Sequence, residues 1–199
     1  LPVGRVEALL IQLRQSLFGP AMESVATCPA CNERLEFAFT GADLGADTYP
    51  EPPQRVSLEQ DGYRLTLRLP TGADVRAASG NGDRLLDHLL VEATHDDGGN
   101  AHRIADPSLL PDAVVEAAAT TVQAADPLAN VTISLSCPAC QHQWAASFDA
   151  ISYFWREIEA WAVRTLHAVH TLASQYGWRE DDILAMSAWR RSLYLEMIG

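Results

Sequence analysis

The sequence predicts an α+β protein whose parts are joined at four cysteines. Two short Cys-Pro-Ala-Cys motifs hold all four cysteines and lie far apart in the chain. A stretch of alternating apolar and polar residues at 54–70 indicates a β-hairpin between the motifs, and the last third of the chain carries a long apolar stripe at helical spacing. These observations favour a cysteine core with an inserted hairpin-plus-helices subdomain, followed by a long C-terminal helix and short helices.

The two cysteine motifs predict one metal site. Cys-x-x-Cys is a tight turn that can point two thiolates at one ion, and two such turns supply the four sulfurs that Zn²⁺ prefers. The residues after the motifs align without a gap, and Leu35, Phe37 and Phe39 alternate with polar or small residues, as in a half-buried strand. We therefore expect a zinc-ribbon-like core with one structural Zn²⁺ ion. Its expected ligands are Cys28, Cys31, Cys137 and Cys140.

Two other interpretations of the cysteines fit the sequence less well. A Cys-Pro-x-Cys redox site opens a helix after a strand, and no helical pattern follows either motif. A pair of disulfides needs an oxidising compartment, and nothing at the start of the sequence resembles a signal peptide. Catalytic zinc keeps one coordination position for water, and four thiolates leave no vacancy. We expect His142 to be a solvated turn residue rather than a ligand.

The charge and hydropathy of the chain argue against two classes of partner. Fourteen basic and twenty-six acidic residues give a net charge of −12, which repels phosphates, so we expect no nucleic-acid partner. No stretch approaches the ~20 apolar residues that span a bilayer. We expect a soluble, cytoplasmic protein, and because the first residue is Leu1 rather than Met, we expect processing, trimming or disorder upstream of it.

The elements before the second motif are predicted from their spacing. A helix is expected at residues 4–18, ended by Gly19-Pro20, and a hairpin turns at Asp61-Gly62. Further helices are expected from Asp74 to Ala78 and at residues 83–94 and 111–125, before a strand at 131–135. The apolar stripe of the first helix consists of Val6, Leu9, Leu10, Leu13 and Leu17.

The length between the motifs predicts how the chain is divided. The 105 residues between Cys31 and Cys137 exceed what a compact zinc ribbon needs. Closing such a loop costs a few kcal/mol, whereas structural zinc is worth about 10–16 kcal/mol in small peptides. We therefore expect one metal-stapled unit formed by residues 1–40 and 131–199, with residues 41–130 as an inserted subdomain.

The C-terminal third carries the strongest helical pattern. Its apolar stripe predicts a helix over residues 149–176, followed by short helices at 178–186 and 187–198. Most of its apolar residues are expected to form a core, and its aromatic residues are also candidates for a partner surface. These candidates are Phe154, Trp155, Trp161, Trp178, Trp189 and Tyr194.

Several segments together resemble a known family. The chain is similar to phage baseplate proteins of the T-even-type hub assembly chaperone family, which also occur in prophages and contractile injection clusters. The resemblance is carried by Leu-Pro-Val-Gly-Arg at 1–5, Phe-Gly-Pro at 18–20, both cysteine motifs, and residues 67–72, 154–162, 176–178 and 189–196. It implies a non-enzymatic role in building a contractile-tail hub through contacts with hub or spike proteins, and possible incorporation in a phage-tail-like particle.

The residues themselves agree with a binding protein rather than an enzyme. No nucleophile–base pair and no Gly-rich phosphate loop stands out, and we expect no small-molecule substrate and no catalytic residue. A zinc-ribbon regulator or nucleic-acid adaptor is the alternative, and a metal-dependent hydrolase is a third hypothesis. Salt-dependent retention on DNA would favour the adaptor, and a water-bearing metal would favour the hydrolase.

Overall fold

The computed structural model describes residues 1–81 and 85–198. Two compact units make up the fold, Leu1–Ala150 and Ile151–Gly199. The predicted part 131–199 groups the second cysteine motif with the C-terminal helices, whereas the structure places the strands around that motif in the first unit. The difference arises because the residues beyond Ala150 pack among themselves, in a core around Leu172 and Ile183.

The first unit begins with the predicted helix, α1 (Val3–Phe18). The face that α1 buries is not the predicted leucine stripe, because Leu9, Leu13 and Leu17 are exposed. Polar groups of the buried face have specific partners: the guanidinium of Arg14 donates to the carbonyl of Gly19. The buried residues of α1 are Gly4, Glu7, Ala8, Ile11 and Arg14.

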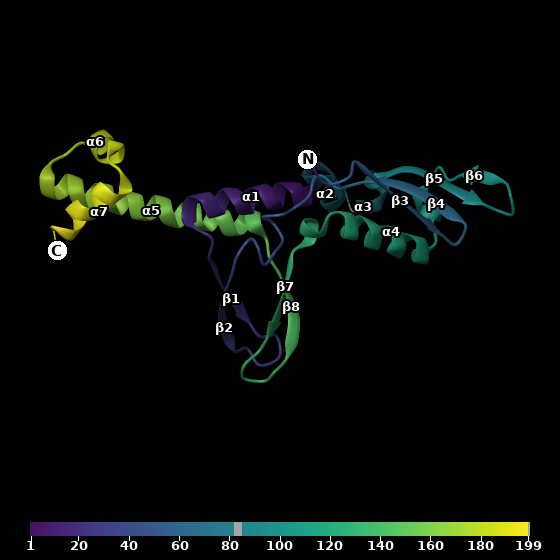
Figure 1. Ribbon diagram of the computed structural model, residues 1–199, viewed down its shortest axis with the longest axis horizontal. Helices are drawn as coiled ribbons and strands as arrows, with labels where there is room; N and C mark the ends of the chain where they lie inside the picture. The colour runs from purple at the N-terminus through teal and green to yellow at the C-terminus, as the bar shows by residue number, and fades with distance from the viewer. Residues whose placement is uncertain (82–84, 199) are drawn as a thin grey trace. The chain divides into compact units, whose positions relative to one another are not determined.

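Two antiparallel hairpins carry the cysteine motifs and lie side by side (Figure 1). The first consists of β1 (Met22–Thr27) and β2 (Arg34–Phe39), and the second of β7 (Thr132–Ser136) and β8 (Gln143–Ser147). In both hairpins half-buried and exposed residues alternate, as the sequence predicts. Each hairpin therefore has one face turned inward and one turned to solvent.

The insert between the hairpins is a four-stranded antiparallel sheet with the strand order β3-β4-β5-β6. Strands β3 (Arg55–Gln60) and β4 (Tyr63–Arg68) form the predicted hairpin. Its turn residues Asp61 and Gly62 both have positive φ, which is the conformation that a two-residue hairpin turn requires. Helix α4 (Asp112–Ala125), also predicted, packs against β3 and β4.

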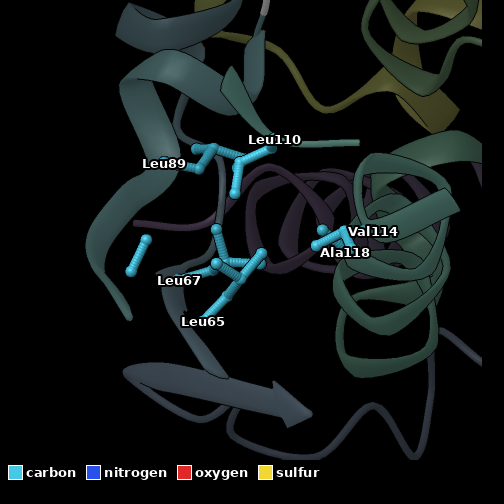
Figure 2. Packing of buried hydrophobic residues seen from close by; sticks show 7 residues of the cluster. Leu65, Leu67, Leu89, Leu110, Val114 and Ala118 are labelled. Atoms are coloured by element: carbon cyan, nitrogen blue, oxygen red, sulfur yellow. The ribbon is translucent and has the colours of Figure 1, made fainter. Parts of the chain in front are cut away.

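The core of the insert lies between the sheet and α4. Figure 2 shows side chains from β4, α4 and the neighbouring segments pointing toward one another. Leu65, Leu67 and Val114 are fully buried there. Burying such a side chain is worth about 1.5–3 kcal/mol, so this cluster is the main hydrophobic support of the insert. The buried members are Leu65, Leu67, Leu89, Ala93, Leu110, Val114 and Ala118.

One predicted helix of the insert is largely a strand. The short helix expected near Asp74 is present as α2 (Gly72–Asn81), but the helix expected at 83–94 forms only α3 (Leu85–Leu89) and then continues as β5 (Leu90–Asp96). Its predicted start at Asp83 lies outside the described residues. Pairing of β5 with β4 and with β6 (Ala101–Arg103) overrides the helical spacing of the leucines.

Buried polar contacts join the insert to α1. The carboxylate of Asp126, just after α4, is fully buried and accepts hydrogen bonds from the backbone amide of Gly4 and the hydroxyl of Tyr49. Pro2 at the N-terminal cap position of α1 makes no side-chain hydrogen bond. Asp126 therefore supplies the acceptor that the first turn of a helix needs, from 122 residues away.

The second unit is helical, as predicted. It contains nearly all of α5 (Ala150–Tyr176), with α6 (Glu180–Ala185) and α7 (Ala188–Glu196). Gly177 ends α5 with a φ of 66°, and the hydroxyl of Ser187 caps α7 by accepting from the amide of Arg190. No helix in the described residues is long and apolar enough to cross a membrane.

Candidate metal centre

The two cysteine turns have the same backbone structure. In the first, the amide of Cys28 donates to the carbonyl of Glu33 at 2.8 Å, and the amide of Asn32 donates to the carbonyl of Cys28 at 2.9 Å. In the second, the amide of Cys137 donates to the carbonyl of His142, and the amide of Gln141 to the carbonyl of Cys137, both at 2.9 Å. Each hairpin thus ends in one tight loop that presents two sulfurs.

The residue after the second cysteine of each loop has a left-handed backbone. Asn32 has a φ of 60° and Gln141 a φ of 61°. This conformation costs a residue with a Cβ roughly 1–2 kcal/mol, so it is kept only where the loop requires it. It reverses the chain so that the amide of the next residue, Glu33 or His142, hydrogen-bonds to the sulfur of Cys31 or Cys140.

The two hairpins meet in a locally two-fold arrangement. The sulfur of Cys28 lies 3.7 Å from that of Cys140, and the sulfur of Cys31 lies 3.5 Å from that of Cys137. Each contact therefore pairs the first cysteine of one loop with the second cysteine of the other. The equivalent residues Phe39 and Phe148 also meet, with ring centroids 5.0 Å apart. Such reciprocal contacts are the pattern of a two-fold interface, here within one chain.

The four sulfurs have the spacing of a tetrahedral thiolate site. All four lie within 4.8 Å of one another. A Zn–S bond of ~2.3 Å in a tetrahedron places the sulfurs about 3.8 Å apart, which is close to the distances of the two cross-loop pairs. A disulfide would need about 2.05 Å, and all four cysteines are free. The residues present therefore fit one ion held by four cysteines.

The pKa values of Cys28 and Cys31 are shifted in opposite directions by their surroundings. Burial raises the pKa of Cys28, but hydrogen bonds from the backbone amides of Ala30 and Cys31 outweigh it and lower the pKa to about 7. The pKa of Cys31 is raised to about 12, because the neighbouring sulfurs and burial outweigh the hydrogen bond from the amide of Glu33. Four adjacent thiolates need a cation between them, and a bound divalent metal supplies it.

The arrangement suits a structural role for the ion. Cys28 and Cys137 are buried, and Cys31 and Cys140 are exposed at the loop tips. Four sulfurs complete a tetrahedron, so no ligand position remains for water or substrate. The ring of His142 lies alongside that of Trp144 with centroids 6.1 Å apart, and the residue is exposed, as expected of a turn histidine.

Comparison with known proteins places this cysteine-bearing region in a family. The model of the T4 bacteriophage base plate protein family matches residues 1–155. The chain belongs to this family. The match contains both hairpins, the insert and all four cysteines, and it ends near the start of α5. No curated protein and no solved structure matches the chain.

Membership of the base plate family makes other baseplate proteins the expected partners and a phage particle the expected setting. The aromatic residues predicted to contact partners have different environments. Trp155, Trp161 and Trp189 are exposed by 60 %, 49 % and 73 %. Phe154 is buried and offers no surface. Trp178 and Tyr194 are half-buried and pack edge to face, with centroids 4.8 Å apart.

The sequence analysis of this base plate family chain missed two groups of residues: those that shape the cysteine loops and two buried acids that link distant parts of the first unit. Asn32 and Gln141 shape the loops, and their equivalent positions after the two motifs could have pointed to them. Asp126 and Glu7 hold the first unit together from within: a carboxylate oxygen of Glu7 accepts from the amide of Ala150 at 3.3 Å. Nothing in the local sequence separates these two acids from the other twenty-four.

Proposed function

We propose that this chain is a non-enzymatic structural component of a contractile-tail baseplate hub, which acts through protein–protein contacts and takes part in assembly of the hub. The match to the base plate family over residues 1–155 is the observation that carries the proposal. The closed four-cysteine geometry supports a structural rather than a catalytic metal.

We propose Zn²⁺ as the ion. Four thiolates in a tetrahedron, with no carboxylate or water position, are the ligand set of structural zinc sites. The ion joins two hairpins whose cysteines are 106 and 112 residues apart in the chain. Its role is to hold the ends of the insert together, so that the first unit presents a fixed surface to its partners.

The metal assignment is tested by composition and spectroscopy. Protein purified without added metal should contain one zinc per chain, and Co²⁺ in its place should give the absorption of a tetrahedral thiolate site. Cys28→Ser should lose the ion, whereas His142→Ala should keep it. Full retention of zinc by Cys28→Ser would contradict the shared site.

A surface for baseplate partners is offered by the outer side of α7. Trp189 of α7 and Met197, which directly follows the helix, are exposed by 73 % and 71 %. Exposed tryptophan and methionine are typical of interface centres, because large apolar side chains gain most when a partner covers them. We propose that a hub or spike protein of the baseplate covers this face.

The partner proposal is tested by co-purification from cells that assemble the tail. Tagged wild-type chain should retain hub or spike proteins, and Trp189→Ala should lose them while keeping zinc and helicity. Arg179→Ala, an exposed change in the same unit, is the matched control. Retention of DNA in place of proteins, weakened by salt, would instead support the nucleic-acid adaptor.

A further inference from the structure

The first part of α5 carries an apolar stripe that its own unit leaves bare. Ile151, Trp155 and Leu166 are exposed by 54 %, 60 % and 61 %, and Val163 beside them by 54 %. Their spacing of four and eleven residues places the first three on one side of a helix. Further along α5, Val169 is buried in the core with α6 and α7. The helices of the second unit thus cover the end of this stripe and leave residues 151–166 uncovered.

The charged residues beside the stripe can pair with the same residues of a second copy. Arg156 and Glu159 are both exposed and flank the stripe three residues apart. If a second α5 runs antiparallel, Arg156 of each copy comes opposite Glu159 of the other, which gives two opposite-charge pairs. In a parallel pair this flank of one helix would face the opposite flank of the other, so Arg156 and Glu159 would not meet. The charges therefore favour an antiparallel, two-fold pairing.

The side-chain sizes along the stripe favour the same register. The register that aligns Arg156 with Glu159 also brings Trp155 of one copy over Ala162 of the other. Ala162 is the smallest residue of this segment of the stripe and is only half-buried, so the indole has room there. Next to it α5 is hollowed between Val163, Leu166, His167 and His170. Trp155 of each copy therefore meets a small residue of the other, and Ile151 comes level with the hollow.

The distribution of net charge leaves this surface able to meet a second copy. Residues 151–199 hold five arginines and six acidic residues, a net charge of −1, whereas residues 1–150 hold nine arginines and twenty acidic residues, a net charge of −11. Contact through the first unit would bring two strongly acidic surfaces together. Contact through α5 joins nearly neutral surfaces and costs less electrostatic repulsion.

We propose that residues 151–166 of α5 bind the same residues of a second copy of this chain in an antiparallel, two-fold helix pair. The stripe is about 22 Å long at 1.5 Å per residue. A contact of this length centred on two tryptophans buries on the order of 1,200 Å², the lower limit for a specific interface. An interface at this limit is typical of weak association, so we expect a dimer that dissociates on dilution. The proposal goes beyond the proposed function and does not use the α7 face.

Sedimentation velocity over a concentration series from micromolar to hundreds of micromolar tests the dimer with the full chain. Wild type should change from monomer to dimer across the series. Leu166→Glu and Trp155→Ala should stay monomeric, because both positions are exposed and the changes leave the fold intact. Trp189→Ala, also an exposed aromatic change, should dimerise like wild type. A wild-type monomer at every concentration would overturn the proposal, as would dimers of Leu166→Glu.

A charge exchange tests the register. Arg156→Glu alone and Glu159→Arg alone should each weaken the dimer at least tenfold, because each variant brings like charges together. An equimolar mixture of the two variants should restore a dimer containing one copy of each. If the mixture stays monomeric while wild type dimerises, the antiparallel register is wrong.

Salt separates this contact from binding to a basic partner. The helix pair is mainly apolar, and salt weakens the Arg156–Glu159 pairs while it screens the repulsion between copies of net charge −12, so raised salt should change the dimer only slightly. Binding of a basic baseplate protein would weaken under the same change. Loss of hub proteins by Trp189→Ala with an unchanged dimer would support both proposals independently. Complete dissociation of the dimer at raised salt would contradict this one, because the apolar stripe would then not hold the two copies together.

Discussion

The two units of this chain are held together in different ways. In Leu1–Ala150 the decisive contacts join residues that are distant in sequence: cysteine sulfurs 106 and 112 residues apart, and Gly4 with Asp126. In Ile151–Gly199 neighbouring helices pack around Val169, Leu172 and Ile183, all within fifteen positions of the chain. The first unit therefore depends on a few long-range links, and the second on local helix packing. Changes to one kind of contact should leave the other unit unaffected.

The largest expected effect is loss of the metal link. Cys137→Ser should release the ion and unfold both hairpins, because structural zinc contributes on the order of 10 kcal/mol or more in small zinc-binding peptides. Hydrogen exchange should become fast in β1, β2, β7 and β8 and stay slow in the C-terminal part of α5. His142→Ala is the control. Equal loss of protection in both units would remove the contrast between them.

The matching change in the second unit is Ile183→Ala. Ile183 is fully buried between α5 and α7, so we expect a loss of about 2–5 kcal/mol in the stability of that unit. Zinc content should not change. Leu184→Ala, at the next position but 44 % exposed, should cost much less. Thermal unfolding followed by circular dichroism, with metal analysis of the same samples, checks both variants.

A smaller effect is expected at the buried link between α1 and the insert. Asp126→Ala leaves the amide of Gly4 and the hydroxyl of Tyr49 without their acceptor, which should cost about 1–3 kcal/mol. Gly4→Ala should also destabilise the unit, because the added Cβ would overlap the Asp126 carboxylate. Urea unfolding measures both, with exposed Glu116→Ala as the reference. An Asp126→Ala protein as stable as the reference would show that this link contributes little.

The smallest effect concerns pH. Burial raises the pKa of Glu7, although the amide of Ala150 partly offsets this by donating to the carboxylate. The ionised form is therefore disfavoured in the folded state, and the stability that this costs at neutral pH is recovered as the pH falls through the raised pKa toward the unfolded value of 4.5.

Glu7→Gln should therefore raise the melting temperature slightly at pH 7, and the gain should shrink as the pH is lowered toward 5. Glu33→Gln, an exposed change in the same unit, should show no such trend. Differential scanning calorimetry of the two variants and wild type gives the comparison. A gain that grows toward acid pH would contradict the sign of the pKa shift.

The cysteine cluster, the β3–β4 hairpin and most helices could be predicted because local signals determine them. Turn residues such as Asp61-Gly62 and the Cys-x-x-Cys spacing act over a few positions. Strand β5 could not be predicted in this way, since its leucines fit a helix and only pairing with β4 decides its conformation. The buried face of α1 could not be predicted either, because Glu7 is buried with a partner 143 residues away, and the buried Arg14 pairs with the carbonyl of Gly19 just past the helix.

The residues of the partner surface were the hardest to predict from the sequence, because an aromatic residue on a helix can point either into the core or to solvent. Phe154 and Trp155 are adjacent in sequence, yet the first is buried and the second is 60 % exposed. Helical spacing distinguishes such neighbours only when the direction of the core is known. In α5 the buried side is not the same along the whole helix, since α6 and α7 cover only its C-terminal end.

The near-equivalence of the two cysteine loops would also determine how a bound ion exchanges with its surroundings. Each loop has one sulfur sheltered inside and one at its tip, so a competing chelator meets Cys31 and Cys140 first. These two sulfurs occupy equivalent places in the two loops, so either one would be open to displacement first. The buried sulfurs of Cys28 and Cys137 would then hold a bound ion longest, whereas the exposed pair would be the first that a chelator reaches.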